Sequence, residues 1–175
     1  KTYDGTTEAA ITGATLNGVV SGDVVSLEND TTGAFAQSDV GENISVSTAM
    51  TLSGMDAGNY SLTEPTIAAN IRAKELTVNN ATVSDKTYDG TTGAAITGAA
   101  LNGVVSGDVV SLANHTIGAF DQPDVGSDII VSTAMTLSGT DLGNYTLTQP
   151  TLTADIIQKE LTIGGTFTVN NKVYD

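Results

Sequence analysis

A repeat of 85 residues constrains the fold of this chain more than any other feature. The segment KTYDGTT at Lys1–Thr7 returns unchanged at Lys86–Thr92, and LNGVVSGDVVSL at Leu16–Leu27 returns at Leu101–Leu112. This period is too long for the common solenoid repeats and suits one small domain per copy. Copies as similar as these favour a function that depends on the number or the length of the units.

The pattern within each copy predicts an all-β fold. Short β-branched segments are separated by turn residues about every 8–12 residues, and no segment combines helical apolar spacing with helix caps. The strands expected in the second copy are Leu76–Val78, Lys86–Tyr88, Ala94–Thr97, Val109–Leu112, Ile129–Leu137, Asn144–Thr148 and Thr153–Ile157. About seven strands in a domain of this size is the density of a β-sandwich.

A recurring tyrosine pattern indicates a particular kind of sandwich. The spacing D-x-G-x-Y-x-L occurs twice, and its first three defined positions are Asp56, Gly58 and Tyr60, then Asp141, Gly143 and Tyr145. In immunoglobulin domains a tyrosine at such a corner packs in the core, and its hydroxyl bonds to the backbone. We expect the same here, with the aspartate and glycine setting the turn. An ordinary turn leading into a strand is the alternative.

The KTYDGTT segment is interpreted as a strand end and a turn, and not as a chemical site. Tyr3 and Tyr88 are expected to point inward near the end of the first strand. Gly5 and Gly90 follow an aspartate, in a position where glycine adopts backbone conformations that other residues avoid. The clipped KVYD at residues 172–175 is the third occurrence of the segment.

Composition excludes several classes of function. The formal net charge is −14, from 20 acidic and 6 basic residues. Nucleic acid is therefore a disfavoured partner, because few cations are present to neutralise phosphates. The chain contains no Cys, which excludes disulfides and thiolate chemistry. No segment approaches the roughly 20 apolar residues of a membrane helix, so membrane insertion is not expected.

The polar joints between copies predict three segments. Residues 1–73 form a first repeat that lacks its own first strand, residues 74–158 form a complete second repeat, and residues 159–175 form the opening strand of a third. The chain begins inside a repeat, so we expect it to be an excised fragment of a longer protein.

The segments KTYDGTT, GDVVSL, GNY-x-L and K-E-L-T-V/I together resemble the YDG repeat domains of bacterial adhesins, which are related to MBG repeats. The resemblance covers nearly the whole chain. It implies tandem Ig-like β-sandwich domains in filamentous-haemagglutinin-like surface proteins, and therefore an extracellular location on the bacterial cell surface. It also implies no cofactor and no catalytic residue.

Residues capable of chemistry are few, so we expect no enzyme. The single histidine, His115, is replaced by Asp30 in the first copy. Calcium is the stronger ionic hypothesis, because it binds carboxylate and carbonyl oxygens. Asp124 and Asp128 are the candidate metal ligands, although no D-x-D-x-D-G loop is present.

These observations predict a non-catalytic stalk or spacer whose partners are neighbouring repeats of the same chain. One alternative is a filament subunit that donates its C-terminal strand, residues 161–175, to another copy. A second alternative is a module that binds a glycan or protein receptor through its loops.

Overall fold

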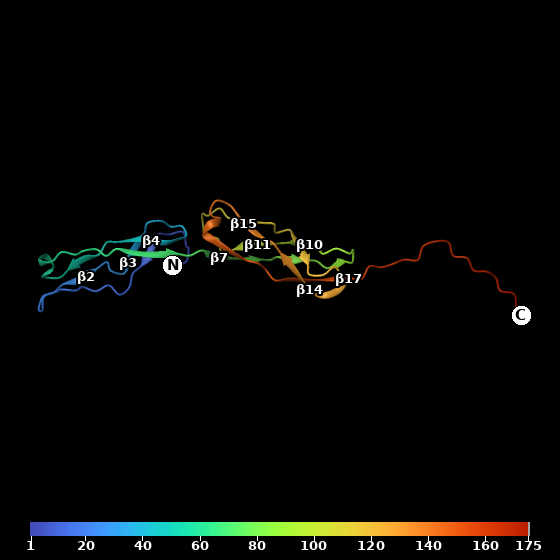
Figure 1. Cartoon of the computed structure of the whole chain (residues 1–175), viewed down its shortest axis with the longest axis horizontal. Helices are drawn as coiled ribbons and strands as arrows, with labels where there is room; N and C mark the ends of the chain where they lie inside the picture. Colours follow the sequence, from blue (N-terminus) through green and yellow to red (C-terminus); the bar gives the residue numbers. More distant parts are fainter. Residues whose placement is uncertain (175) are drawn as a thin grey trace. The chain divides into compact units, whose positions relative to one another are not determined.

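The computed structural model describes residues 1–174 and confirms an all-β protein (Figure 1). Its strands in the first half are β1 (Glu8–Ala10), β2 (Ser26–Glu28), β3 (Thr32–Phe35), β4 (Gly41–Thr48), β5 (Thr51–Ser53) and β6 (Ile67–Ile71). The others are β7 (Lys74–Asn79), β8 (Thr82–Val83), β9 (Lys86–Thr87), β10 (Gly93–Thr97), β11 (Ala100–Asn102), β12 (Ser111–Ala113), β13 (Ile117–Phe120), β14 (Gly126–Thr133), β15 (Thr136–Ser138), β16 (Tyr145–Thr148) and β17 (Leu152–Ile157). Two single 3-10 turns, η1 (Ala57–Asn59) and η2 (Leu142–Asn144), precede the corner tyrosines. Among the described residues, no helix has the length and apolar character needed to cross a membrane.

The chain divides into two compact units. The first contains residues 1–79, 100–114 and 135–150, and the second contains residues 80–99, 115–134 and those from 151 onward. The first unit thus includes the whole first repeat and part of the second. The repeat boundaries at Lys74 and Lys159 remain predictions from the sequence period.

The first unit contains four small sheets. In the first repeat, β1, β3, β4 and β6 form an antiparallel sheet, and β2 pairs with β5. In the second repeat, β7 lies between antiparallel β11 and parallel β16, and β12 pairs with β15. Leu147 of β16 lies opposite Leu76 of β7 in this register.

The core of the first unit follows the alternation of its strands. Along β4, Ile44 and Val46 point inward while their neighbours point outward, as expected when one face of a strand is buried. They join a cluster that includes Ile71 and Leu76, whose side chains are almost completely buried. Burying one such side chain stabilises the fold by about 1.5–3 kcal/mol.

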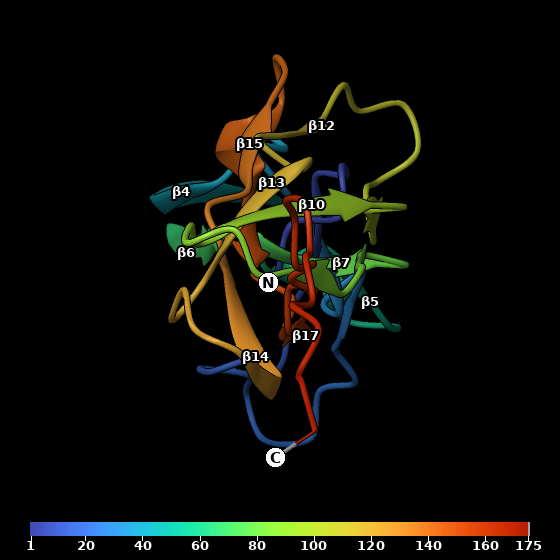
Figure 2. The ribbon, with the colours of Figure 1, turned by 90° about the vertical axis from the view of Figure 1, so that its right-hand side faces the viewer.

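The second unit is built on one six-stranded sheet in the order β8-β10-β13-β14-β17-β9, and several of its strands are labelled in Figure 2. Phe120, Val131 and Ile156 are its most deeply buried side chains. β14 has a register shift between Gly126 and Ile129, as β4 has between Gly41 and Ile44. The two copies therefore share even their irregularity.

Most of the predicted strands are confirmed, with one clear difference. The run Ile129–Leu137 was expected to be one strand, but it is divided between β14 and β15. Met135 lies at the break, where its backbone N–H donates to Gln149 Oε1 at 3.2 Å and its carbonyl accepts from Gln149 Nε2 at 2.7 Å. The side-chain amide thus replaces a strand partner, which a local pattern does not reveal.

The end of the chain behaves differently from the rest. Residues 158–174 form no strand (Figure 1), and apolar side chains in this segment are largely exposed.

The first repeat has two strands fewer than the second around its opening strand. Residues 15–17 and 60–63 form no strands. Their counterparts one period later, 100–102 and 145–148, are β11 and β16, the two neighbours of β7.

Candidate functional site

Within the first unit, the KTYDGTT segment of the first repeat packs against the tyrosine corner of the second. The rings of Tyr3 and Tyr145 meet edge to face, with centroids 5.4 Å apart and planes at 77°. Both side chains are buried, at 5% and 6% exposure. A pair in this arrangement contributes about 0.5–1.5 kcal/mol beyond the area that it buries.

One carboxylate binds both tyrosines. Asp108 Oδ2 accepts a hydrogen bond from Tyr3 Oη at 2.9 Å and another from Tyr145 Oη. Tyr145 Oη also accepts from the backbone N–H of Val105 at 3.0 Å, which confirms the predicted bond between the corner hydroxyl and the backbone. Burial, assisted by the bond to Asp108, raises the pKa of Tyr3 to about 12. Burial, again assisted by the bond to Asp108, also raises the pKa of Tyr145.

A buried amide completes the junction. Asn144 is 7% exposed, and its Oδ1 accepts from the backbone N–H of Val40 at 2.9 Å. Its Nδ2 donates to Asp39 Oδ1 at 3.1 Å. Residues of the second repeat therefore bond to a loop of the first, which is the loop between β3 and β4. We call these contacts of Tyr3, Asp39, Val40, Asp108, Asn144 and Tyr145 the junction.

The same corner exists in the first repeat. Tyr60 Oη accepts from the backbone N–H of Val20 at 3.0 Å and donates to Asp23 Oδ2 at 2.6 Å. Hydrogen bonding to Asp23 raises the pKa of Tyr60. The corner aspartates were expected to set the turn, but their side chains do not cap the 3-10 turns that follow them. Asp56 and Asp141 instead each accept a backbone N–H from a distant segment, from Val24 at 2.8 Å and from Val109 at 2.7 Å.

The turn in KTYDGTT is fixed by its aspartate. Asp4 Oδ1 accepts from the backbone N–H and the hydroxyl of Thr6, both at 2.9 Å, and lies 2.6 Å from Lys1 Nζ. Asp89 makes the equivalent contacts with Thr91 and Lys86. The hydrogen bond from the adjacent lysine, with those from the threonine, lowers the pKa of Asp4 and of Asp89 to about 2.

The glycine after each of these aspartates has the expected left-handed backbone. Gly5 has φ +78° and Gly90 has φ +77°. At Gly5 a Cβ atom would also lie 3.1 Å from Val105 Cγ1, whereas at Gly90 it would meet no atom within 4 Å. The first position is therefore restricted by Val105 of the second repeat as well as by its backbone.

Comparison with known proteins assigns both copies to one family. The model of the YDG domain matches residues 1–68 and again residues 72–153, so the two matches cover most of the chain. The chain belongs to the YDG domain family. Each match contains one KTYDGTT segment and one tyrosine corner, and the junction therefore joins two YDG domains. No curated protein and no solved structure matches the chain.

Two expectations about the YDG domains need correction. Tyr88 was expected to point inward like Tyr3, but it is 39% exposed, because the residues that cover Tyr3 come from the following YDG domain. Gly58 and Gly143 were expected to set the corner turn. A Cβ atom at either position would meet no atom within 4 Å, so the 3-10 turns do not require glycine for space.

The sequence pattern predicted the corner tyrosines but not their partners. Asp108 was expected in a turn, Asn144 at the tyrosine corner and Asp39 among solvated loop charges, and none of the three was predicted to join the two repeats. A signal was available, because all three recur one period away as Asp23, Asn59 and Asp124.

Asp124 and Asp128, the candidate calcium ligands, make backbone contacts with neighbouring side chains. The carbonyl of Asp124 accepts from Gln122 Nε2 at 3.4 Å, and the backbone N–H of Asp128 donates to Asp155 Oδ1 at 2.8 Å. Asp128 occupies the irregularity of β14 with φ 52°. Among residues 1–174, no group of three or more His, Cys, Asp or Glu side chains is arranged to hold a metal ion.

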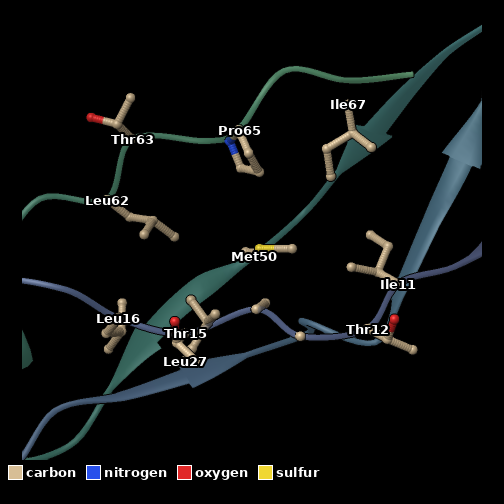
Figure 3. Close-up of a pocket in the computed structure, with 12 residues that line it drawn as sticks. Ile11, Thr12, Thr15, Leu16, Leu27, Met50, Leu62, Thr63, Pro65 and Ile67 are labelled. Carbon is tan, nitrogen blue, oxygen red and sulfur yellow. The ribbon is translucent and has the colours of Figure 1, made fainter. Parts of the chain in front are cut away.

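An apolar groove crosses the first YDG domain. The side chains of Leu16, Met50 and Leu62 face it (Figure 3), and two adjoining parts have volumes of about 320 and 310 Å³. In the second YDG domain, the counterparts of Leu16 and Leu62 are Leu101 and Leu147, which pack with the cluster that contains Leu76. The groove thus corresponds to the place that β7 occupies in the second domain.

Proposed function

We propose that the chain is a pair of tandem Ig-like β-sandwich domains that serve as a non-catalytic stalk or spacer in an extracellular bacterial adhesin. The all-β fold and the hydroxyl-to-backbone bonds of Tyr60 and Tyr145 support the sandwich. The likeness of the chain to YDG repeats of bacterial adhesins, a group related to MBG repeats, supports the location. No cofactor is needed for a mechanical role of this kind.

The junction is the observation that carries this proposal. Only residues 72 and 73 separate β6 from β7, so the backbone between the two domains is short. The tyrosine pair and Asn144 add contacts from loops that lie on other elements. A joint held at several points resists bending, and each further domain would then add a fixed increment of length.

Distance measurements between spin labels test the stiffness of the joint. Because the chain has no Cys, labels attach only at introduced positions such as Ser21→Cys and Ser111→Cys. We expect a narrow distance distribution that broadens in Asn144→Ala, whereas the matched change Asn59→Ala leaves it narrow. A broad distribution in the unmodified junction would contradict a stalk.

Location is tested separately on cells that produce the protein. An antibody against the chain should label intact cells as strongly as permeabilised ones if the domains lie outside the cell. Labelling that requires permeabilisation would contradict an adhesin.

The groove favours a second function, the assembly of filaments by strand donation. Residues 159–163 read KELTI, and β7 begins KELTV. Leu161 and Ile163 are 86% and 84% exposed, whereas Leu76 is fully buried between β11 and β16. The C-terminal segment of one copy has the side chains to fill the groove of another copy by β-augmentation.

A synthetic peptide of residues 159–169 tests strand donation. We expect it to bind the full chain and to shift the NMR signals of Leu16 and Leu62. Leu161→Asp in the peptide should abolish binding, while Thr162→Asp, whose counterpart Thr77 is exposed, should have a small effect. Binding that is unchanged by Leu161→Asp would overturn this second function.

A further inference from the structure

The outer face of the six-stranded sheet in the second unit differs in chemistry from its counterpart in the first repeat. The alternation of the strands defines this face. Along β14, Ile129 and Val131 are buried, so Ile130 between them points outward. Along β17, Ala154 and Ile156 are buried in the same way, and the residues that alternate with them point outward.

Three isoleucines are exposed to water on this face. Ile117, Ile130 and Ile157 are 72%, 53% and 49% exposed, respectively. They belong to β13, β14 and β17, which are neighbours in the sheet. The positions one period earlier carry polar side chains, which are Thr32, Ser45 and Arg72. Each change between the repeats thus places a large apolar side chain where the first repeat is polar.

Acidic side chains lie beside the central isoleucine. The backbone N–H of Asp121 donates to the carbonyl of Ile130 at 3.0 Å, and Asp121 Oδ1 accepts from Ser132 Oγ at 3.0 Å. On β17, Asp155 Oδ1 accepts from the backbone N–H of Asp128 at 2.8 Å. No Lys or Arg occurs in β10, β13, β14 or β17. We call the surface formed by Ile117, Asp121, Ile130, Asp155 and Ile157 the Ile130 face.

Neither strand formation nor the local fold accounts for these changes. The counterparts of Asp121 and Asp155 in the first repeat are neutral, namely Ala36 and Asn70. Isoleucine is favoured in strands and aspartate is depleted there, so the two kinds of change act on strand formation in opposite directions. Asn70 Oδ1 also accepts a backbone N–H at 2.8 Å, as Asp155 Oδ1 does, so this bond does not require a charge. What the changes share is the surface that they alter.

Neighbouring repeats leave this face open. The first repeat is followed by a second one in the chain, and its Thr32, Ser45 and Arg72 are nevertheless exposed. The second repeat is preceded by the first, and Ile117 and Ile130 are exposed all the same. The face is therefore available to another molecule on a repeat that has a neighbour on either side.

We infer that the Ile130 face is a docking surface for a basic protein segment in which apolar side chains alternate with Lys or Arg. The isoleucines gain from the removal of apolar area from water, and the carboxylates of Asp121 and Asp155 pair with the cations. A second copy of this chain fits less well, because its own face carries the same carboxylates and each chain has a formal net charge of −14. The inference goes beyond the stalk and does not depend on it, since it requires only the fold of the second repeat.

An NMR titration of the full chain with the synthetic peptide VKVKVKVK tests this inference. We expect the backbone signals of Ile117, Ile130 and Ile157 to shift, while those of the first repeat at the same positions stay unchanged. The first repeat is thus a matched control within the same molecule. The peptide GKGKGKGK has the same charge and should bind at least about tenfold more weakly, because burial of even one valine side chain is worth about that factor.

Variants that exchange residues between the repeats separate the two contributions. I117T/I130S installs the residues of the first repeat and should weaken binding of VKVKVKVK at least about tenfold. D155N should keep the bond to Asp128, as Asn70 keeps its own, and should weaken binding about twofold to fivefold. The effect of D155N should vanish at about 1 M salt, where the Debye length is about 3 Å. S45I/N70D/R72I builds the face on the first repeat and should bring new shifts to β4 and β6.

Each of the other outcomes contradicts the inference. Equal shifts in both repeats would mean that the peptide follows charge alone. Unchanged binding in I117T/I130S with an unchanged urea midpoint would exclude the isoleucines, and an S45I/N70D/R72I variant that gains no shifts in β4 and β6 would exclude the face as a whole. Self-association in sedimentation that is lost in I117T/I130S would identify a second copy as the occupant and overturn the basic partner. The stalk would stand in all these cases, because the distances between spin labels test it separately.

Discussion

The tyrosine of the KTYDGTT segment is buried in the first repeat, as Tyr3, and exposed in the second, as Tyr88. This difference shows what a neighbouring domain contributes. Tyr3 lies against Tyr145 and bonds to Asp108, all within the first unit. Tyr88 has the same local sequence, the same aspartate-capped turn and the same lysine contact, yet it is exposed. The turn is therefore a property of one repeat, whereas burial of the tyrosine is a property of two.

The largest difference in stability between matched variants of the two repeats should come from the opening strand. Leu76 is fully buried in β7, and Leu161, its counterpart, is 86% exposed. Leu76→Ala should lower the free energy of unfolding by about 2–5 kcal/mol, because it removes buried methyl groups and leaves a cavity. Leu161→Ala should change it by less than about 0.5 kcal/mol in dilute solution. Urea denaturation of both variants measures the difference, and equal losses would contradict the assignment of β7.

The corner asparagines should give the next largest contrast. Asn144→Ala removes two part-buried hydrogen bonds, with the N–H of Val40 and with one oxygen of Asp39, which together should cost about 1–3 kcal/mol. Asn59→Ala changes an exposed side chain and should cost less than about 0.5 kcal/mol. Urea denaturation compares the two. A similar loss in both variants would mean that the amide stabilises each corner internally and not the junction.

The contrast between the two asparagines also explains which features of the fold and the site could be predicted from the sequence. Strand positions, the capped Asp4 and Asp89 turns and the hydroxyl bonds of Tyr60 and Tyr145 follow from local patterns, and the structure confirms them. Local patterns contain no information about which copy faces another. Asn144 and Asn59 therefore looked alike in the sequence, although one is buried and one exposed. The break at Met135 was missed for a similar reason, since its partner Gln149 is distant in sequence.

Alkaline pH should weaken the junction. The pKa of Tyr3 is raised from 10.0 to about 12, first by burial and then by the bond to Asp108. Neutral Tyr3 is therefore favoured in the folded state, so its stabilising contribution is fully present below pH 10 and is lost as the pH rises toward 12. The two-label distance distribution should broaden over this interval.

Tyr3→Phe provides the control for the alkaline transition. It removes the ionisable hydroxyl while keeping the ring against Tyr145, so broadening between pH 10 and 12 should be reduced. Tyr88→Phe alters an exposed counterpart and should leave the broadening unchanged. If Tyr3→Phe broadens over the same interval as the unmodified chain, another group controls the transition.

Acid pH should have the smallest effect on stability, and the effect should be the same at the KTYDGTT turns of both repeats. The pKa of Asp4 and of Asp89 is lowered from 3.8 to about 2, chiefly by the bond from the adjacent lysine. A lowered pKa means that the ionised carboxylate is favoured in the folded state. The stabilising contribution is present above pH 3.8 and is lost as the pH falls toward 2. Both groups are exposed, so each contribution is small, and NMR titration of the two carboxyl groups is the direct measurement.

The two aspartates should titrate together, because their partners lie within their own repeats. Lys1 and Thr6 hold Asp4, and Lys86 and Thr91 hold Asp89. Asn144→Ala, which weakens the junction, should leave both titrations unchanged, whereas Lys1→Met should raise the pKa of Asp4 alone. A shift of Asp4 in Asn144→Ala would show that the turn depends on the neighbouring domain. The distinction between a turn made by one repeat and a tyrosine buried by two would then fail.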